Sequence, residues 1–472
     1  MAAEPAFNVS ELIDTRPLGA LQIRIVVLCT LVALLDGLDL QSIGLAAPGI
    51  AADLHIPPPW LSAVFSAALA GLALGAFGFG VLADRVGRKA VLIGATACFG
   101  IFTICTALAP SFAVLLAFRF LAGLGLGGAM PSFISLTSEY SPRRLRAVIV
   151  ALLWAGFPLG GFVGGLLASW IIPAYGWHSV FWVGGVLPLF VCVVLLFALP
   201  ESIGFLVASA APPERIASLL RQMFPSEAVP AHATFVLNEQ RARGVPVVQL
   251  FAAGRAVGTV LLWISFFIAL MMLVTNSAWA PTLLKREGIG IKDASLAMAM
   301  FNLGSVIATS FAGWLITRAG AAIILPVAML GSAASVALIG YAAPSVGMVI
   351  LLQGLFGAFM GGGSSGLIAL AAIYYPTTIR STGVGWAMGM GRVGSFVGPL
   401  AVGSLVAVGL STAGIPWRRR AHEAGPAVAA AGARRADRLG RRRHTVPRRC
   451  FRPRLHRPSA FFPWPHPPAA RS

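Results

Sequence analysis

The sequence predicts an all-α, polytopic membrane protein made of two six-helix repeats, here with about eleven transmembrane helices and with the twelfth missing. Three observations support this prediction. The chain of 472 residues is 57% hydrophobic and only 11% charged, a composition that suits a bilayer better than water. Apolar stretches of the ~20 residues that a spanning helix needs recur along the chain. The two halves also resemble each other in register.

Eleven apolar stretches, separated by short polar turns, are long enough to cross a bilayer. We expect them at residues 23–47, 60–82, 90–108, 112–136, 147–172, 179–199, 257–280, 295–316, 321–341, 346–373 and 383–410. The segment before the first stretch lacks the basic and apolar pattern of a signal peptide. The five cysteines show no CxxC or metal-ligand spacing, so we expect no disulfide, metal or cofactor.

The basic residues predict the orientation of the chain. Short cytoplasmic loops are enriched in Lys and Arg, and every even-numbered stretch is followed by such residues. Arg85, Arg88 and Lys89 follow the second stretch, and Arg380 follows the tenth. The exits of the odd-numbered stretches are poorer in them, so the N-terminus is expected in the cytoplasm.

An internal repeat divides the chain into homologous halves. Gly123 returns in the second half as Gly357, and Tyr140 returns at the same spacing as Tyr374. The expected parts are a cytoplasmic N-terminus (1–22), an N-terminal bundle (23–200), a cytoplasmic linker (201–254), an incomplete C-terminal bundle (255–412) and a tail (413–472). Two parallel repeats with a site between them are typical of a rocking transporter. A receptor or an enzyme built from duplicated bundles is the alternative.

The repeat also predicts a last helix at about 411–433, where the sequence reads STAGIPWRRRAHEAGPAVAAAGA. No helix can span a membrane there. Residues 413–472 are rich in Arg and Pro, and we expect them to be disordered. Our hypothesis is that a frameshift near Ile415 replaces the twelfth helix. The alternative is a real basic arm for anionic lipid or nucleic acid, although no nucleic-acid module is present and most of the excess charge comes from this tail.

The loop after the second stretch reads GVLADRVGRK from Gly80 to Lys89. Gly80 is expected to allow close helix approach, Gly87 to permit a tight turn, and Asp84 to meet a helix N-terminus or an Arg. A basic loop held inside by topology alone is the plainer explanation for Lys89. The second-half copy has Thr317 in place of Asp84.

Charges within spanning helices cost ~2.5 to 3.5 kcal/mol each at a helix centre, so each one is a functional candidate. The four to explain are Asp36, Asp39, Arg119 and Arg392. In the other half of the repeat their positions hold, in the same order, Ala269, Met272, Gln353 and Pro158. Groups that serve only architecture should recur in both halves, so this asymmetry favours a function for all four.

Asp36 and Asp39 are three residues apart and share a helix face. Two carboxylates so close in a poorly solvated cavity should not both be ionised, so one is expected to carry a proton. For Asp39, a packing hydrogen bond to the backbone or to Gln41 is the alternative. Arg119 could receive an anionic substrate or neutralise the two aspartates. Arg392 offers a bidentate partner for a carboxylate.

The motifs together resemble a known family. The 80–89 loop is similar to the signature of the major facilitator superfamily. Asp-Gly-Leu-Asp at 36–39, the stretch RFLAGLGLGGAMPSFISLTSEY at 119–140, Pro-Glu-Ser at 200–202, and the segment from Tyr375-Pro376 to Gly398-Pro399 resemble the aromatic acid:proton symporters. These include bacterial carriers of 4-hydroxybenzoate and protocatechuate. The likeness runs from about Asn8 to Leu410.

The resemblance implies proton-coupled uptake of a small aromatic carboxylate across the bacterial inner membrane, and we expect a monomer. The sequence shows no ATP-binding loop, metal cluster or nucleophile triad, so we expect no enzyme activity. The resemblance also implies proton coupling at Asp36 and Asp39 and substrate contacts at Arg119 and Arg392. Weaker candidates for substrate contact are Asn276, Asn302 and Gln353, and the aromatic rings of Phe65, Trp154, Phe157, Phe301 and Trp386. Gating is expected at Gly80, Asp84, Arg85, Gly87, Arg88, Glu139 and Arg380. The alternatives are an aromatic-acid receptor without transport, or another organic-anion or sugar symporter of the superfamily.

Overall fold

The structure is a computed structural model that describes residues 7–225, 229, 234–236, 247–252, 254–342, 345–376 and 379–408. These residues belong to one compact unit, Met1–Thr412. The expected tail, the proposed frameshift and the missing twelfth helix lie outside the described residues.

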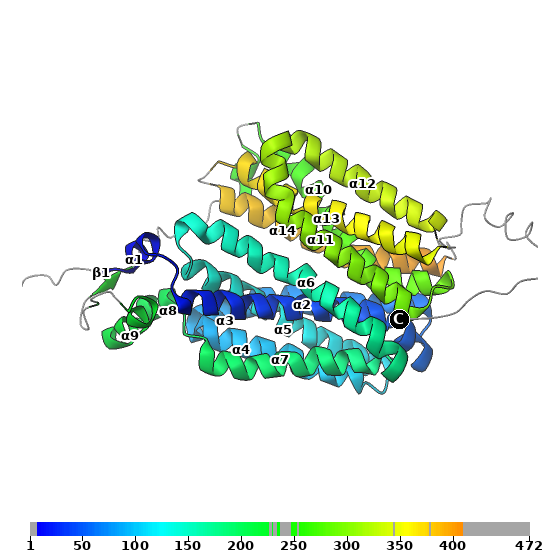
Figure 1. The fold of residues 1–472 in the computed structure, drawn as a ribbon, viewed down its shortest axis with the longest axis horizontal. Coiled ribbons are helices and arrows are strands. Elements are labelled where there is room, and N and C mark those ends of the chain that lie inside the picture. Colours follow the sequence, from blue (N-terminus) through cyan, green and yellow to red (C-terminus); the bar gives the residue numbers. More distant parts are fainter. Residues whose placement is uncertain are drawn as a thin grey trace, which may run out of the picture. The chain divides into compact units, whose positions relative to one another are not determined.

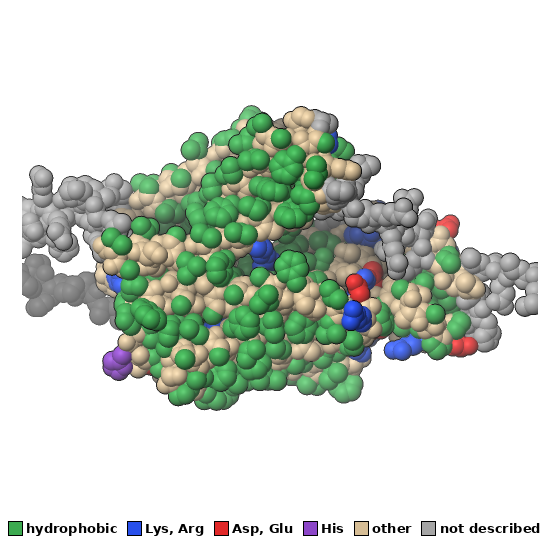
Figure 2. Space-filling view, turned by 180° about the vertical axis from the view of Figure 1, so that it is seen from behind, with side chains coloured by type: hydrophobic (Ala, Val, Ile, Leu, Met, Phe, Trp, Pro, Cys, Tyr) green, Lys and Arg blue, Asp and Glu red, His purple; other side chains and the backbone are tan. Residues whose placement is uncertain are grey.

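Eleven helices of the described part are long and apolar enough to cross a membrane, which confirms the predicted number (Figure 1). They are α2 (Ala20–Asp53), α3 (Leu61–Val86), α4 (Arg88–Ala107), α5 (Phe112–Glu139), α6 (Arg143–Tyr175), α7 (His178–Ala198), α10 (Ala256–Arg286), α11 (Ile291–Ala319), α12 (Ala321–Ala342), α13 (Val346–Tyr374) and α14 (Arg380–Ala407). Apolar side chains cover much of the outer surface of these helices (Figure 2). Such a surface is stable against lipid, so the chain is a multi-pass membrane protein.

The sequence repeat is also a repeat of helix packing. A Cβ atom on Gly123 of α5 would collide with the carbonyl of Ala68, and one on Gly357 of α13 would collide with the carbonyl of Phe301. Small residues allow helices to approach this closely. The same correspondence holds for Gly160 against Leu34 and Gly394 against Phe267. Helices α2–α7 and α10–α14 are therefore two halves with the same internal packing.

The two halves meet through α2 with α10, α6 with α11, and α3 with α14. We call the end where α2 and α10 begin the linker end, and the opposite end the far end. Close contacts between the halves lie toward the far end, where a Cβ on Gly44 would collide with the carbonyl of Ser277. Phe65 and Trp279 also meet there edge to face, with ring centroids 5.7 Å apart.

A small cap covers the linker end of the first half. It consists of β1 (Phe7–Asn8), α1 (Val9–Thr15), α8 (Ile203–Ala208), α9 (Pro213–Met223) and β2 (Phe235–Val236). The two strands pair in parallel, and Val9 and Ile13 are buried in the same hydrophobic cluster as Leu220 and Met223. Figure 1 shows these elements together beside the start of α2. The N-terminal segment thus holds the first part of the linker.

The last part of the linker packs on the second half instead. The short 3-10 helix Val247–Leu250 precedes α10, and the Leu250 side chain is buried in the second-half core. The Thr259 hydroxyl donates to the Leu250 carbonyl over 2.9 Å. Each end of the linker is therefore fixed to a different half.

Candidate functional site

A cavity of about 210 Å³ lies between the two halves, and the space-filling view shows the molecule hollowed between them (Figure 2). Helices α2, α3, α5 and α6 line it from the first half, and α10, α11, α13 and α14 from the second. The first-half wall is mostly apolar, with Leu69, Leu72, Met130, Trp154 and Phe157. An apolar cavity with a few convergent polar groups is typical of a small-molecule site.

Arg392 is the cationic side chain among the described residues that line this cavity. It lies on α14 and reaches across the interface, where its Nη2 atom donates to the Met130 sulfur over 2.8 Å. A thioether is a weak acceptor, so most of the donor capacity of the guanidinium remains for a ligand. The planar guanidinium suits a carboxylate, which it can bind through two parallel hydrogen bonds.

Asp39 and Arg119 form an ion pair that is fully enclosed within the first half. Arg119 Nη2 lies 3.0 Å from Asp39 Oδ2, and Arg119 Nη1 donates to Asp39 Oδ1 over 3.3 Å. The Thr103 hydroxyl also donates to Asp39 Oδ1 over 2.9 Å. Asp39 and Arg119 are both 0% exposed, and neither lines the cavity. The structure thus places Arg119 against Asp39 and away from the cavity.

Asp36 lies one turn away on α2 in a different environment. It is 3% exposed, and neither of its carboxylate oxygens has a hydrogen-bond partner among the described residues. Its neighbour Gly37 lines the cavity. The charges that act on Asp36 are those of Arg392, from the other half, and of Asp39. Of the two aspartates, Asp36 is the one that can exchange a proton without breaking an ion pair.

The three amide candidates divide into a pair and a single residue. The Asn276 and Gln353 amides bond to each other over 3.2 and 3.3 Å, and neither lines the cavity. Asn302 does line the cavity, and its Nδ2 donates to the Met298 carbonyl over 2.9 Å. Asn302 therefore keeps its side-chain oxygen available, whereas the other two amides satisfy each other.

The aromatic candidates divide in the same way. Trp154, Phe157 and Phe301 line the cavity. Phe65 packs on Trp279 at the far end, and Trp386 stacks on Trp263 with ring centroids 5.8 Å apart. Three of the five rings can thus contact a bound molecule.

The 80–89 loop lies at the linker end and joins elements of the first half. Gly87 has φ +104°, which confirms the tight turn expected there. The close approach expected at Gly80 is wrong for this structure, because a Cβ there would meet nothing within 4 Å. Asp84 and Arg85 are exposed and form no hydrogen bond or ion pair with the described residues. The loop therefore leaves two of its charges unengaged.

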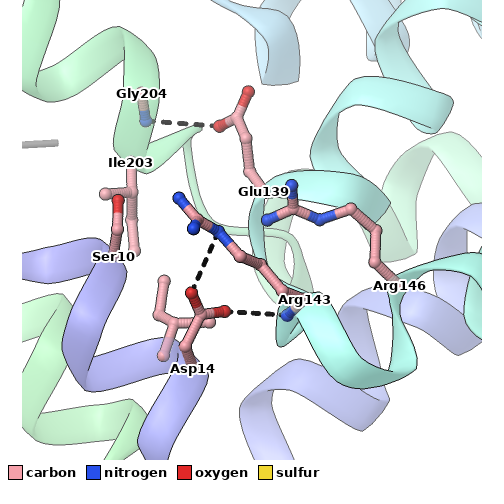
Figure 3. Close-up of a pocket in the computed structure, with 8 residues that line it drawn as sticks. Ser10, Asp14, Glu139, Arg143, Arg146, Ile203 and Gly204 are labelled. Carbon is pink, nitrogen blue, oxygen red and sulfur yellow. Dashed lines mark hydrogen bonds and ion pairs between the residues drawn. The ribbon is translucent and has the colours of Figure 1, made fainter. Parts of the chain in front are cut away.

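Arg88 pairs instead with Glu139 at the end of α5, and Glu139 accepts from the Gly204 backbone over 3.2 Å (Figure 3). The adjoining Lys89 backbone donates to the Glu201 carboxylate over 3.0 Å. These contacts join the loop and α5 to α8. Arg380, the remaining gating candidate, bonds locally to the Tyr375 carbonyl over 3.4 Å.

Figure 3 shows the N-terminal segment tied to the same region. Asp14 Oδ1 accepts from the Arg143 backbone at the start of α6 over 2.7 Å, and Asp14 Oδ2 lies 3.2 Å from Arg143 Nε. The buried Tyr140 hydroxyl donates to the Glu201 carbonyl. Burial, and then the charge of Glu201, raise the pKa of Tyr140 above its usual range, so its hydroxyl remains a donor.

Sequence reasoning missed several groups at the site. Thr103 holds Asp39, and Met130 contacts Arg392. Four hydroxyls of α11 and α13 also line the cavity, from Ser305, Thr309, Ser364 and Ser365. Comparing the two halves position by position could have found these hydroxyls, because their counterparts in the first half carry no hydroxyl.

Comparisons with known proteins agree with this architecture. A family model described as Major Facilitator Superfamily matches residues 29–292 and 261–418. The chain is 38% identical to a 4-hydroxybenzoate transporter of Pseudomonas aeruginosa, over 87% of this chain and 92% of that protein. It is 35% identical to a gallate transporter of Pseudomonas putida, over 85% of this chain and 90% of that protein. A crystal structure of a D-xylose-proton symporter matches with a TM-score of 0.63 and 18% identity, over 81% of this chain and 89% of that one.

Proposed function

The chain belongs to the major facilitator superfamily, and we propose that it imports small aromatic carboxylates together with protons. The observation that supports this most directly is the cavity between the halves, where Arg392 is the cation among largely apolar residues. A carboxylate can bind that guanidinium while an aromatic ring lies against Trp154 and Phe157. The relatives named as transporters of 4-hydroxybenzoate and gallate support the same class of substrate.

The proposed proton carrier is Asp36. When ionised, its carboxylate attracts Arg392 across the interface. A proton on Asp36 removes that attraction, so that the guanidinium attracts the substrate carboxylate without competition from Asp36. Binding of the anion is therefore favoured when Asp36 is protonated. This preference couples movement of the substrate to movement of the proton. The Asp39 and Arg119 pair holds α2 and α5 in register behind the site.

The proposed orientation places the linker end in the cytoplasm of a bacterial cell and the far end outside the inner membrane. The basic residues at the linker end support it, because short cytoplasmic loops are enriched in Lys and Arg. One chain encloses the cavity among its described residues, so we propose that a monomer is the transporting unit. Gating is assigned to the 80–89 loop, in which Asp84 and Arg85 are free to engage another element.

Uptake of radiolabelled 4-hydroxybenzoate by cells that express the chain, with and without a protonophore, tests the proposal. We expect uptake that the protonophore abolishes and that Asp36→Asn removes. Asp293→Asn is the matched control, because Asp293 lies in the first turn of α11 and outside the cavity lining. Uptake that the protonophore leaves unchanged would contradict proton coupling. Binding to the purified protein without uptake would contradict transport.

A further inference from the structure

The two walls of the cavity differ in polarity, although the repeat makes them equivalent. At positions that correspond in the repeat, α3 and α5 carry Leu69, Leu72, Ala76, Met130 and Pro131 where α11 and α13 carry Asn302, Ser305, Thr309, Ser364 and Ser365. All five second-half residues line the cavity. A change from apolar to polar at five equivalent positions is not required by the packing, which is the same in both halves.

The four hydroxyls lie on two adjacent helices that line the same cavity. Helices α11 and α13 pack closely, since a Cβ on Gly361 would collide with Ser305 and one on Gly304 would collide with the carbonyl of Gly354. We call Ser305, Thr309, Ser364 and Ser365 the hydroxyl wall. It faces the apolar residues of the first half across the cavity.

The hydroxyl wall also has hydrogen-bonding capacity to spare. Serines in helices often donate to the carbonyl four residues earlier, as Ser310 does to Val306 over 2.9 Å. Ser305, Thr309 and Ser365 form no hydrogen bond with a described residue, and the Ser364 hydroxyl contacts only the Met360 sulfur, at 3.9 Å. A hydroxyl can both donate and accept, so these groups suit a ligand hydroxyl.

The hydroxyl wall and Arg392 lie at similar distances from the linker end of the molecule. Arg392 lies in the fourth turn of α14, which begins at Arg380, and Ser365 lies in the third turn from the end of α13 at Tyr374. At about 1.5 Å per residue, these are depths of about 18 and about 14 Å from the linker end. A ligand can therefore contact both across the cavity rather than along it.

We propose that the hydroxyl wall binds a hydroxyl substituent on the ring, so that the protein selects hydroxylated aromatic carboxylates over unsubstituted benzoate. This inference rests on the proposed function and adds the residues that set its selectivity. Arg392 holds the carboxylate, the apolar wall covers the ring, and the hydroxyl wall receives the polar end. A site that bonds a ligand hydroxyl disfavours the analogue that lacks it.

The test compares uptake of 4-hydroxybenzoate and of benzoate by the native chain and by the double variant Ser305→Ala, Ser365→Ala. The double variant should lower the ratio of the rate for 4-hydroxybenzoate to the rate for benzoate by roughly 2- to 12-fold for each hydrogen bond lost. Ser310→Ala is the matched control, because Ser310 is an exposed residue of α11 outside the cavity lining. Its ratio should equal that of the native chain.

The possible failures are distinguishable. An unchanged ratio in the double variant overturns the hydroxyl wall and leaves the proposed function intact. Absence of uptake of both compounds by the native chain overturns the proposed function and this inference with it. Ser364→Ala alone, with binding followed by quenching of tryptophan fluorescence in the purified protein, supplies the same comparison if the double variant does not fold. Equal loss of binding for both compounds would also contradict selectivity.

Discussion

Asp36 and Asp39 are neighbours on one helix face, yet their surroundings differ in kind. Asp39 has a bidentate partner in Arg119 and a donor in Thr103. Asp36 has no hydrogen-bond partner among the described residues. The charge of Arg392 acts on it from the other half. The difference is consistent with the proposed roles, in which Asp39 holds the first half together and Asp36 carries the proton.

Neutralising the two aspartates should affect the stability of the protein differently. Asp39→Asn leaves Arg119 as an uncompensated buried charge, which costs about 3 to 5 kcal/mol, so the thermal midpoint of the purified protein should fall by several degrees. Asp36→Asn removes a carboxylate without a bonded partner, so its midpoint should be unchanged or higher. Thermal unfolding in detergent measures both. Similar losses in the two variants would refute the assignment.

The charged part of the site could be predicted from the sequence, because charges in spanning helices are costly and therefore informative. The partner of each charge could not be predicted in this way. Whether Arg119 meets Asp39 or a substrate depends on how α5 packs on α2, and the pairing of Asn276 with Gln353 depends on α10 and α13. The hydroxyls escaped notice because a serine in a helix normally satisfies itself on its own backbone.

At the scale of helices, glycines set how closely the two halves approach at the far end. Gly44 of α2 lies against the carbonyl of Ser277 in α10, and Gly403 of α14 lies against Ser62 of α3. A larger side chain at either position would hold the helices apart. The far end can therefore close only because these residues carry no Cβ atom.

We expect Gly44→Leu to keep the far end open. The measurement is labelling of Ser395→Cys, a position that lines the cavity, by a membrane-impermeant thiol reagent in intact cells. The background lacks the native cysteines. Labelling should be strong with Gly44→Leu and weak without it. Gly78→Leu is the control, since a Cβ at Gly78 would meet nothing within 4 Å. Equal labelling with and without Gly44→Leu would contradict the role of Gly44 in closing the far end.

The spanning helices could be predicted because apolar length and flanking charge are local properties of the sequence. The cap at the linker end could not be predicted from such local properties. Its strands are very short and pair Phe7 with Phe235, residues that are far apart in the chain and carry no periodic pattern. The burial of Val9 and Ile13 against the linker and the ion pair of Asp14 with Arg143 show that the N-terminal segment belongs to the first half.

The whole molecule is in the state that is closed at the far end. The closest packing of α2 on α10 and of α3 on α14 lies there, whereas Trp154, Thr309, Ile368 and Met388 of the cavity lining lie in the linker-end halves of their helices. Asp84 and Arg85 are exposed at the linker end. In the proposed orientation, this is the state that faces the cytoplasm, and in it Asp84 and Arg85 of the proposed gating loop have no partner among the described residues.

Asp84→Asn should therefore slow transport without changing the stability of the protein. Asp84 is exposed and has no partner among the described residues in this state, so the substitution should change the free energy of unfolding by no more than about 0.5 kcal/mol. It should slow uptake of 4-hydroxybenzoate, because in the proposed gating role Asp84 forms a contact when the linker end closes, and the substitution removes that contact. Unchanged uptake would show that Asp84 has no role in gating.

The contact between Arg392 and Met130 has a consequence for every turnover. The Asp39 and Arg119 pair lies within one half, so it can persist through the whole cycle. The bond from Arg392 to the Met130 sulfur joins the two halves, so it must break and form again each time they rock. A thioether is among the weakest acceptors in proteins. The guanidinium can therefore leave it at little cost, and the cycle is not trapped at this step.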